Sequence, residues 1–316
     1  MTPNSIAFLF PGQGSQVVGM GKELADKYPI ARQTFEEADD ALGYKLSQVC
    51  FEGPEDKLRL TEITQPAILT VSVAAFRVLN ERGLKPHYVA GHSLGEYSAH
   101  VAANTVSFAD AVRTVRNRGK FMQEAVPIGV GAMAAILGMN IDKVNGICEE
   151  AAQGEVCEAA NINSPEQIVI SGHAGAVERA TKLADERGAK KAKLLPVSAP
   201  FHCSLMKPAQ DRLAGHLNAL QLNSPGTPVV CNVDAAVVAS ADQARDALLR
   251  QVTGAVKWEQ SVRLLISKGV QSFVEVGPGK VLWGLMRQID RAPSSLYVGD
   301  DSSLQKTLEH FSQAKG

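Results

Sequence analysis

The segment HYVAGHSLGEYSAH, residues 87–100, joins an apolar run typical of a β-strand to a helical pattern. Ser93 stands at the junction, between Gly91 and Gly95. Glycines permit a tight turn and close packing between a strand and the next helix, and a serine on such a turn exposes its hydroxyl, as in a nucleophile elbow. The pattern is short and also occurs in ordinary glycine-rich turns, so other residues must decide whether Ser93 is catalytic.

Apolar β-type runs alternate with helical patterns on both sides of this turn. The expected strands are residues 6–10, 88–90, 228–233, 272–276 and 295–299. The expected helices lie within residues 20–42, 65–82, 203–220, 242–268 and 279–290. Such alternation predicts an α/β architecture with a parallel sheet.

The middle third of the chain has a different rhythm. Its runs read in the order strand, helix, strand, strand, helix, strand, from AMAAILGM to KAKLLPV. This βαββαβ order is typical of the split ferredoxin-like unit. We therefore expect a small subdomain at 129–197, inserted into a large α/β subdomain that comprises 1–128 and 198–316.

Composition excludes several function classes. Lysine and arginine number 32 against 33 acidic residues, a net charge of −1, which gives no global electrostatic case for nucleic acid or an anionic membrane. The first residues lack a secretory pattern and no apolar run approaches the length of a membrane span, so we expect a soluble, cytoplasmic protein. The five cysteines are scattered without C-x-x-C spacing, which indicates neither a disulfide framework nor a metal site, and Cys203 is interpreted as a packed thiol.

Two glycine-rich turns, residues 11–21 and 276–284, follow strands but complete neither a dinucleotide nor a Walker pattern. A nucleotide cofactor is therefore not expected. If the first strand neighbours the strand before Ser93, backbone N–H groups of the first turn would lie beside the elbow, where they could face an oxyanion.

A nucleophilic serine needs a base, and the chain has seven histidines. His92 adjoins Ser93, but its side chain should diverge at such a turn and buttress the loop. His202 follows a strand and Pro200, at the chain reversal where the small subdomain rejoins the large one, so it is well placed to line a cleft. On these residues alone, a core histidine whose ring is satisfied by backbone groups is the favoured interpretation.

The helix that starts at Ser107 carries a candidate substrate-binding residue. Ser107 and Asp110 form a capping-box pattern, and an apolar stripe follows at helical spacing. Arg118 lies at the edge of this stripe, where an isolated charge would be costly. Its guanidinium could bind a structural carboxylate or grip a substrate carboxylate with two hydrogen bonds.

Taken together, these motifs resemble the malonyl-CoA:acyl carrier protein transacylases. The resemblance runs from about residue 6 to 290 and rests on the motifs FPGQGSQ, TQPAI, GHSLGEYSA, RGKFMQ, GAMAAILG, NINSPEQIVISG, VSAPFHCSLM, NVDA and VEVGPGKVL. It implies an α/β-hydrolase-like large subdomain with a ferredoxin-like insert. The enzyme would move a malonyl group from coenzyme A to the phosphopantetheine thiol of acyl carrier protein in fatty acid synthesis.

The resemblance also implies a role for each matching residue. Ser93 would be the nucleophile that forms a malonyl ester in a ping-pong reaction, with His202 as general base and acid. The other implied roles are the malonyl carboxylate partner (Arg118), backbone N–H donors of the oxyanion hole (Gln13 and Leu94), a backbone carbonyl that orients the histidine (Gln251) and a restriction on the acyl group (Phe201). No metal or resident cofactor is implied.

Carrier proteins are acidic, so a docking surface should be basic. Lys190, Lys191 and Lys193 precede His202 by about ten residues and could reach the rim of the cleft, or they could only solvate an edge strand. Three other functions stay open: a discrete acyltransferase of a polyketide synthase, a serine esterase or thioesterase, and a non-catalytic scaffold. An esterase predicts an HGGG-type loop, which the sequence lacks.

Overall fold

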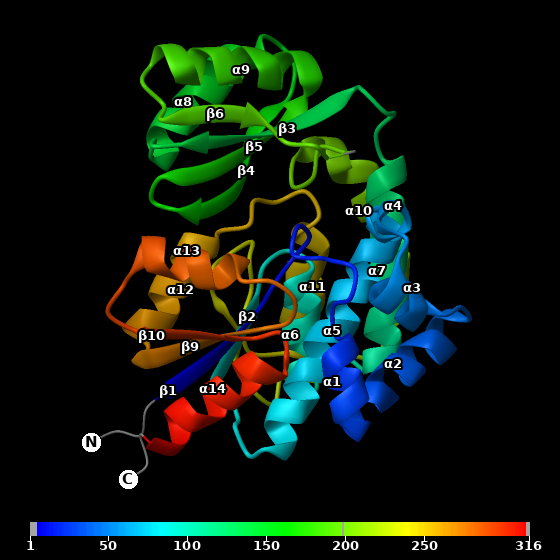
Figure 1. Ribbon diagram of the computed structural model, residues 1–316. Helices are drawn as coiled ribbons and strands as arrows, with labels where there is room; N and C mark the ends of the chain where they lie inside the picture. Colours follow the sequence, from blue (N-terminus) through cyan, green and yellow to red (C-terminus); the bar gives the residue numbers. More distant parts are fainter. Residues whose placement is uncertain (1–4, 198, 314–316) are drawn as a thin grey trace.

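The structure is a computed structural model that describes residues 5–197 and 199–313. In this range the strands form two sheets, which belong to two stacked parts of the molecule (Figure 1). Their bounds are β1 Ser5–Phe10, β2 Tyr88–Gly91, β3 Gly131–Leu137, β4 Cys157–Ser164, β5 Gln167–His173, β6 Lys191–Leu194, β7 Val229–Val230, β8 Val237–Val238, β9 Val270–Val276 and β10 Ser294–Val298.

The helices surround these sheets. Their bounds are α1 Lys22–Lys27, α2 Pro29–Leu42, α3 Leu46–Glu52, α4 Glu55–Leu58, α5 Thr61–Glu81, α6 Gly95–Ala102, α7 Phe108–Glu124, α8 Ile141–Ala152, α9 Ala174–Glu186, the 3₁₀ turn η1 Ser204–Met206, α10 Lys207–Ala219, α11 Ala241–Arg250, α12 Trp258–Ser267, α13 Val281–Ile289 and α14 Asp301–Gln313.

The large sheet has the order β10-β9-β1-β2-β7-β8, and all its pairings are parallel except that of β7 with β8. Strand β1 shows why this sheet is covered on both faces. Phe8 and Phe10 pack into the core under α2, α5 and α7, whereas Ala7 and Leu9 pack toward α12 and α13. Successive side chains of a strand point to opposite faces, so a strand that is apolar at every position is buried on both.

The small sheet is antiparallel and has the order β4-β5-β3-β6. Helices α8 and α9 cover one face of it, with Ala134, Ile136 and Ile170 in the core between them. This is the predicted ferredoxin-like βαββαβ unit, and every one of its elements lies between residues 131 and 194. The limits 129 and 197 stay a proposal. The boundary residue 198, and residues 1–4 and 314–316 of the large subdomain, lie outside the described residues.

Local chemistry explains where the expected elements differ from the structure. The helix expected within 20–42 is two helices, because Tyr28, which precedes Pro29, has an extended backbone with φ −120° and ψ 115°. The strand expected at 228–233 keeps only Val229 and Val230, since the backbone N–H of Asn232 turns away to donate to Glu96. The short elements α3, α4 and β8 were not predicted.

Helix α5 passes through the core of the large subdomain. The expectation that no apolar run approaches the length of a membrane span was wrong for α5, the one described helix with that length and apolarity, but 83% of its most apolar window is buried inside the protein. Helix α7 packs against it closely: a Cβ on Gly119 would lie 2.6 Å from the carbonyl oxygen of Thr61. Core packing thus accounts for the apolar composition of α5, and the close approach brings α7 to the site.

Candidate active site

Ser93 lies on the turn between β2 and α6 with φ 50°, in the left-handed region that non-glycine residues seldom adopt. The two flanking glycines make this turn possible. A Cβ on Gly91 would lie 1.9 Å from the carbonyl carbon of Gly95, and a Cβ on Gly95 would lie 2.0 Å from the carbonyl oxygen of Phe10. The backbone N–H of Ser93 donates a 2.7 Å hydrogen bond to Asn232 Oδ1. The predicted nucleophile elbow is therefore present.

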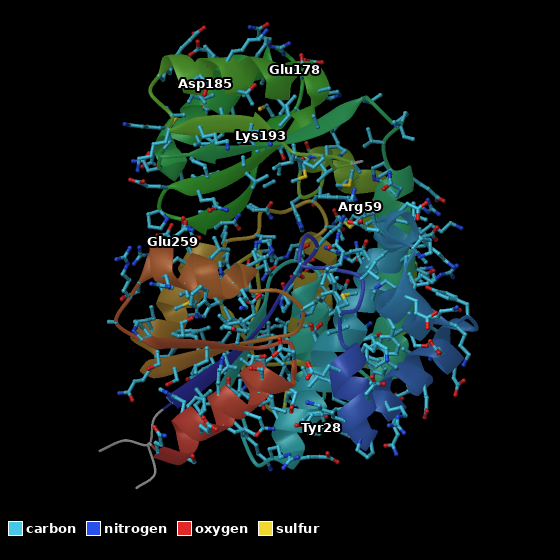
Figure 2. The ribbon with its side chains drawn as sticks, in the orientation of Figure 1. Tyr28, Arg59, Glu178, Asp185, Lys193 and Glu259 are labelled. Atoms are coloured by element: carbon cyan, nitrogen blue, oxygen red, sulfur yellow. The ribbon has the colours of Figure 1, made fainter. Side chains whose placement is uncertain are left out.

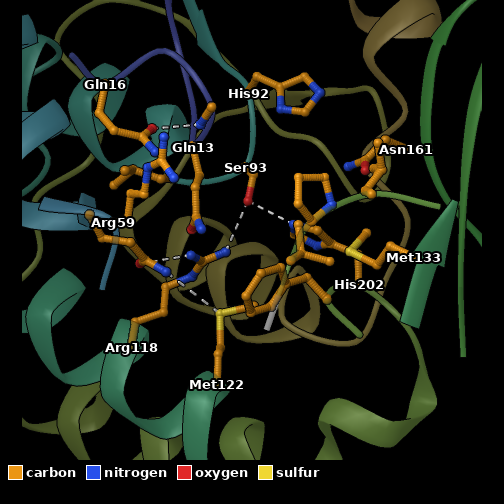
Figure 3. A pocket seen from close by; sticks show the side chains of 17 residues that line it. Gln13, Gln16, Arg59, His92, Ser93, Arg118, Met122, Met133, Asn161 and His202 are labelled. Carbon is orange, nitrogen blue, oxygen red and sulfur yellow. Dashed lines mark hydrogen bonds between the residues drawn. The ribbon is translucent and has the colours of Figure 1, made fainter. Parts of the chain in front are cut away.

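His202 faces the hydroxyl of Ser93, with 2.7 Å between Nε2 and Oγ (Figure 3). Its other ring nitrogen, Nδ1, lies 2.9 Å from the carbonyl oxygen of Gln251 and 3.2 Å from that of Gly254. Carbonyl oxygens only accept hydrogen bonds, so Nδ1 carries the proton and Nε2 accepts from the Ser93 hydroxyl. Both open interpretations of His202 hold in part: backbone carbonyls satisfy one nitrogen, and the other faces the serine.

The surroundings keep the imidazole of His202 neutral. Burial lowers its pKa to about 3, with further contributions from the charge of Arg118 and from His92, while hydrogen bonds to the carbonyls of Gln251 and Gly254 act in the opposite direction. A neutral imidazole with a free Nε2 is the form that can take a proton from a hydroxyl. His202 is thus unprotonated at neutral pH, with Nε2 placed to accept the Ser93 proton.

Arg118 is only 1% exposed and reaches the same hydroxyl from α7. Its Nη2 donates to Ser93 Oγ at 3.2 Å and to Gln251 Oε1 at 2.8 Å, and its Nη1 donates to Gln65 Oε1 at 2.9 Å. Within residues 5–197 and 199–313, no carboxylate forms an ion pair with this guanidinium. The structural carboxylate considered for Arg118 is therefore absent from the described chain, and its protein partners are neutral oxygens.

A pocket of about 560 Å³ opens over Ser93, of a size suited to a small ligand. Figure 3 shows Ser93 between His202 and Arg118, with Met122, Met133 and Asn161 around them. Six of the predicted site residues line this pocket, namely Gln13, Ser93, Leu94, Arg118, Phe201 and His202. Gln251 lies behind the pocket and is fully buried.

The first glycine-rich turn lies against the elbow, because β1 and β2 are neighbours in the sheet. A Cβ on Gly12 would approach the carbonyl oxygen of His92 to 2.5 Å. In the described part of the chain, the backbone N–H groups of Gln13 and Leu94 donate to no protein acceptor. Two free donors beside a serine hydroxyl are what an oxyanion hole requires.

His92 diverges from Ser93 as expected. Its Nε2 pairs with Asn163 Oδ1 at 2.8 Å, and its ring packs against Trp258. Cys203 is also the packed thiol that the sequence indicated, since it is buried and its Sγ donates to the carbonyl oxygen of Pro200. No three His, Cys, Asp or Glu side chains converge to hold a metal ion among the residues that the structure describes.

Strand β6 carries two of the three predicted docking lysines and is an edge strand of the small sheet. Lys191 and Lys193 are exposed, and in register with Leu137 and Ala135 they lie on the face opposite α8 and α9. Figure 2 shows Lys193 on the small subdomain and Arg59 on the large one. Lys190 instead pairs with Glu166 at 2.5 Å. The chain then continues from β6 into Leu195, Pro196 and Val197 of the pocket wall.

The sequence interpretation missed three residues that hold the site together. Gln65 accepts from Arg118, Asn232 accepts from Ser93, and Glu96 accepts from both Asn232 and Gln251. Each lies within a recognised motif, TQPAI, NVDA or GHSLGEYSA. The motifs therefore mark the segments that contain these residues. They do not indicate which hydrogen bonds the three side chains form.

Comparison with known proteins agrees with this geometry. Residues 7–295 match the model of the acyl transferase domain family. The malonyl CoA-acyl carrier protein transacylase of Escherichia coli strain K12 is 51% identical over 96% of this chain and 98% of its own length. That of Bacillus subtilis strain 168 is 48% identical over 97% of both chains.

Solved structures are equally similar. The malonyl CoA-acyl carrier protein transacylase of Coxiella burnetii superposes with a TM-score of 0.95 at 45% identity, covering 97% of this chain and 98% of the other. A malonyl-transacylase in complex with a type II polyketide synthase acyl-carrier protein gives a TM-score of 0.95 at 47% identity, covering 97% and 99%.

Proposed function

The chain belongs to the malonyl CoA-acyl carrier protein transacylases of the acyl transferase domain family, and from this premise we propose how its own residues move a malonyl group from coenzyme A to acyl carrier protein. One observation carries the proposal. The Ser93 hydroxyl donates to the free Nε2 of a neutral His202 and accepts from Arg118, so the nucleophile, the base and a carboxylate-binding cation meet at one oxygen.

In the first half-reaction Ser93 Oγ attacks the thioester carbon of malonyl-CoA while its proton passes to His202 Nε2. The negative charge that forms on the carbonyl oxygen is met by the backbone N–H groups of Gln13 and Leu94. The carbon–sulfur bond then breaks, and the coenzyme A sulfur leaves with the proton from His202. The product is a malonyl ester of Ser93.

The second half-reaction reverses these roles. The phosphopantetheine thiol of acyl carrier protein gives its proton to His202, and the sulfur attacks the ester carbon. Ser93 Oγ leaves as the hydroxyl when His202 returns the proton. The carbonyl oxygens of Gln251 and Gly254 keep Nδ1 protonated throughout, so Nε2 handles every proton transfer. This ping-pong sequence needs no metal and no resident cofactor.

Arg118 binds the free carboxylate of the malonyl group in this proposal. Its hydrogen-bond partners are neutral, none of the ion pairs among the described residues includes it, and its Nε has no hydrogen-bond partner within those residues. Binding the carboxylate in this position also holds the thioester carbonyl near Ser93, so recognition orients the reacting group. Phe201, in the pocket wall, limits the space around the α-carbon of the acyl group.

We further propose that the acidic carrier protein approaches over Lys191 and Lys193. Three features support this surface: the lysines are exposed, they share the face of the small sheet opposite α8 and α9, and their strand leads into the pocket wall. Lys190 contributes less because it is paired with Glu166. The expected cytoplasmic location stays a prediction.

The choice between carrier proteins is a separate question. One similar structure was solved with an acyl-carrier protein of a type II polyketide synthase, so a role for this chain in polyketide synthesis is a second candidate. Parallel transfer assays with a fatty acid and a polyketide carrier protein separate the two, by the ratio of their kcat/KM values.

Mass spectrometry of the protein after incubation with malonyl-CoA tests the proposed chemistry. We expect a malonyl adduct on Ser93 that disappears when acyl carrier protein is added, and no adduct on Ser93→Ala. Rapid release of free malonate without a carrier protein would indicate a hydrolase. An adduct that persists in Ser93→Ala would refute the assignment of the nucleophile.

A further inference from the structure

Glu96 is a fully buried carboxylate on α6, three residues after Ser93. One of its oxygens, Oε2, accepts two hydrogen bonds: from the backbone N–H of Asn232 at 2.9 Å and from Gln251 Nε2 at 2.8 Å. A buried carboxylate is costly unless hydrogen-bonded, so its partners are held firmly in return. Both partners of Glu96 also contact the site.

The side chain of Gln251 links Glu96 to the site. Its Nε2 donates to Glu96 and to the carbonyl oxygen of Ser93 at 2.9 Å, and its Oε1 accepts from Arg118 Nη2 at 2.8 Å. An amide has a donor end and an acceptor end, whereas a guanidinium only donates. If the amide of Gln251 turned over, its NH₂ group would face Arg118 and that hydrogen bond would be lost.

Glu96 decides, together with the carbonyl oxygen of Ser93, which way this amide points. Its Oε2 offers no proton to the Gln251 oxygen, so the NH₂ end must face Glu96 and the oxygen must face Arg118. The second partner, Asn232, acts on the serine itself: its Oδ1 accepts from the backbone N–H of Ser93 and its Nδ2 donates to the carbonyl oxygen of Gly91, both at 2.7 Å. The elbow and the guanidinium are thus tied to one carboxylate.

We propose that Glu96 is a positioning residue that fixes the orientation of the Gln251 amide and through it holds the Arg118 guanidinium beside Ser93. This inference rests on the proposed role of Arg118 as the malonyl carboxylate partner. It makes the malonyl preference depend on a side chain that touches neither substrate nor Arg118. The requirement is an acceptor oxygen at the right distance, not a negative charge.

The surroundings of the second oxygen of Glu96, Oε1, allow the effect of the negative charge to be tested separately from the effect of side-chain length. Its Oε1 has no hydrogen-bond partner within the described residues, and His100 Nε2 lies 4.0 Å away. Burial lowers the pKa of His100 to about 4, so this ring is neutral and can accept a hydrogen bond. A glutamine at position 96 can therefore turn its NH₂ group toward His100 and keep its oxygen toward Asn232 and Gln251. An aspartate keeps the charge but is shorter by one methylene.

The test compares Glu96→Gln with Glu96→Asp and Glu96→Ala by single-turnover acylation of Ser93 with malonyl-CoA and with acetyl-CoA. The rate of malonyl acylation in Glu96→Gln should stay within about threefold of that of the parent protein, since both hydrogen bonds are kept. In Glu96→Asp and Glu96→Ala this rate should fall roughly tenfold or more. The rate of acetyl acylation should fall clearly less, because only malonyl uses Arg118. Glu275→Gln is the matched control: Glu275 is another buried glutamate, which accepts from the backbone N–H of Trp283 outside the pocket.

Two results would overturn the inference. The first is an equal loss of malonyl and acetyl acylation rate in Glu96→Asp, which would mean that Glu96 only stabilises the turn at Ser93. The second is a malonyl acylation rate in Glu96→Gln as low as that in Glu96→Ala. Thermal unfolding of each variant identifies any that do not fold, and the Gln and Asp variants alone are enough to decide. Failure of the proposed function would look different, because the parent protein would then carry no malonyl group on Ser93 or show no preference that depends on Arg118.

Discussion

The guanidinium of Arg118 donates a 3.2 Å hydrogen bond to the hydroxyl oxygen of Ser93, the atom that we propose attacks the thioester. The positive charge favours the alkoxide that develops as Ser93 loses its proton, and it also lowers the pKa of His202. An incoming malonyl carboxylate must share this guanidinium with Ser93. Recognition of the acyl group and activation of the nucleophile are therefore coupled through one side chain.

Replacing Arg118 tests this coupling. Arg118→Ala should lose malonyl transfer far more than acetyl transfer, because only malonate carries the second carboxylate. Truncating one partner of a buried charged pair costs roughly 2–5 kcal/mol, so the preference for malonyl should fall by on the order of 10² or more. Arg118→Lys should restore little, since an ammonium cannot reproduce the planar fork. Steady-state kcat/KM values for both thioesters give the answer, and equal losses would show that Arg118 is only structural.

His202→Ala should slow both half-reactions, because each one moves a proton through Nε2. General base catalysis contributes typically about 10²–10⁴-fold, and we expect losses in this range for acylation by malonyl-CoA and for transfer to the carrier protein. Rapid-quench measurement of each half-reaction separates them. A loss in one half-reaction alone would contradict a shared base. His216→Ala is a suitable control, since His216 is exposed on α10.

The low pKa of His202 predicts an unusual pH profile. Its folded pKa is depressed to about 3, so Nε2 stays unprotonated and competent as pH falls through the ordinary histidine range near 6.5. Glu96, whose pKa is raised to about 7 by burial, does titrate in this range, but protonation of its unpaired Oε1 leaves Oε2 free to accept. We expect kcat/KM for malonyl-CoA to be nearly flat from about pH 8 to about pH 5. A fall in kcat/KM with a midpoint near 6.5 would contradict this expectation, with either His202 or Glu96 as the group that titrates.

Much of the fold could be predicted because its signals are local. Strand β1 and the elements of the small subdomain can be recognised from the apolar pattern of their own residues. The predicted order βαββαβ was correct. The segment after Val230 could not be predicted as a turn, because its direction depends on a hydrogen bond from Asn232 to Glu96, 136 positions away in sequence. Two-residue strands such as β7 and β8 carry too few residues for any periodicity.

The same distinction applies to the site. Ser93 and His202 lie in motifs in which a serine nucleophile and a base are expected. In the structure Ser93 Oγ and His202 Nε2 are 2.7 Å apart. The side chain of Gln251 was not predicted to contribute, because its contacts with Arg118 and Glu96 span 133 and 155 positions. A buried polar residue is recognised only when its partners are known, and the sequence alone does not supply them.

Phe201 offers a test of acyl selectivity. Its side chain is buried in the pocket wall, where Met122 and Met133 also lie. A branching methyl on the α-carbon would overpack this wall at a typical cost of ~1–3 kcal/mol. Phe201→Ala should therefore raise methylmalonyl relative to malonyl transfer, by roughly tenfold for each 1.4 kcal/mol relieved. Direct competition between the two thioesters measures the ratio, and an unchanged ratio would place the α-carbon away from Phe201.

The docking surface can be tested by reversing charge on one face of the small subdomain. Lys191→Glu combined with Lys193→Glu should raise KM for the carrier protein several-fold, because rim charges act mainly on association with an acidic partner. The effect should shrink as salt is added, since exposed charges are screened over about 10 Å at 0.1 M. Acylation by malonyl-CoA should change little. The matched control is Lys143→Glu with Lys182→Glu, which makes the same charge change on α8 and α9, over the opposite face of the sheet. If both double variants raise KM equally, the change in net charge is responsible. If the double variant at Lys191 and Lys193 has no effect at low salt, these lysines only solvate the edge strand.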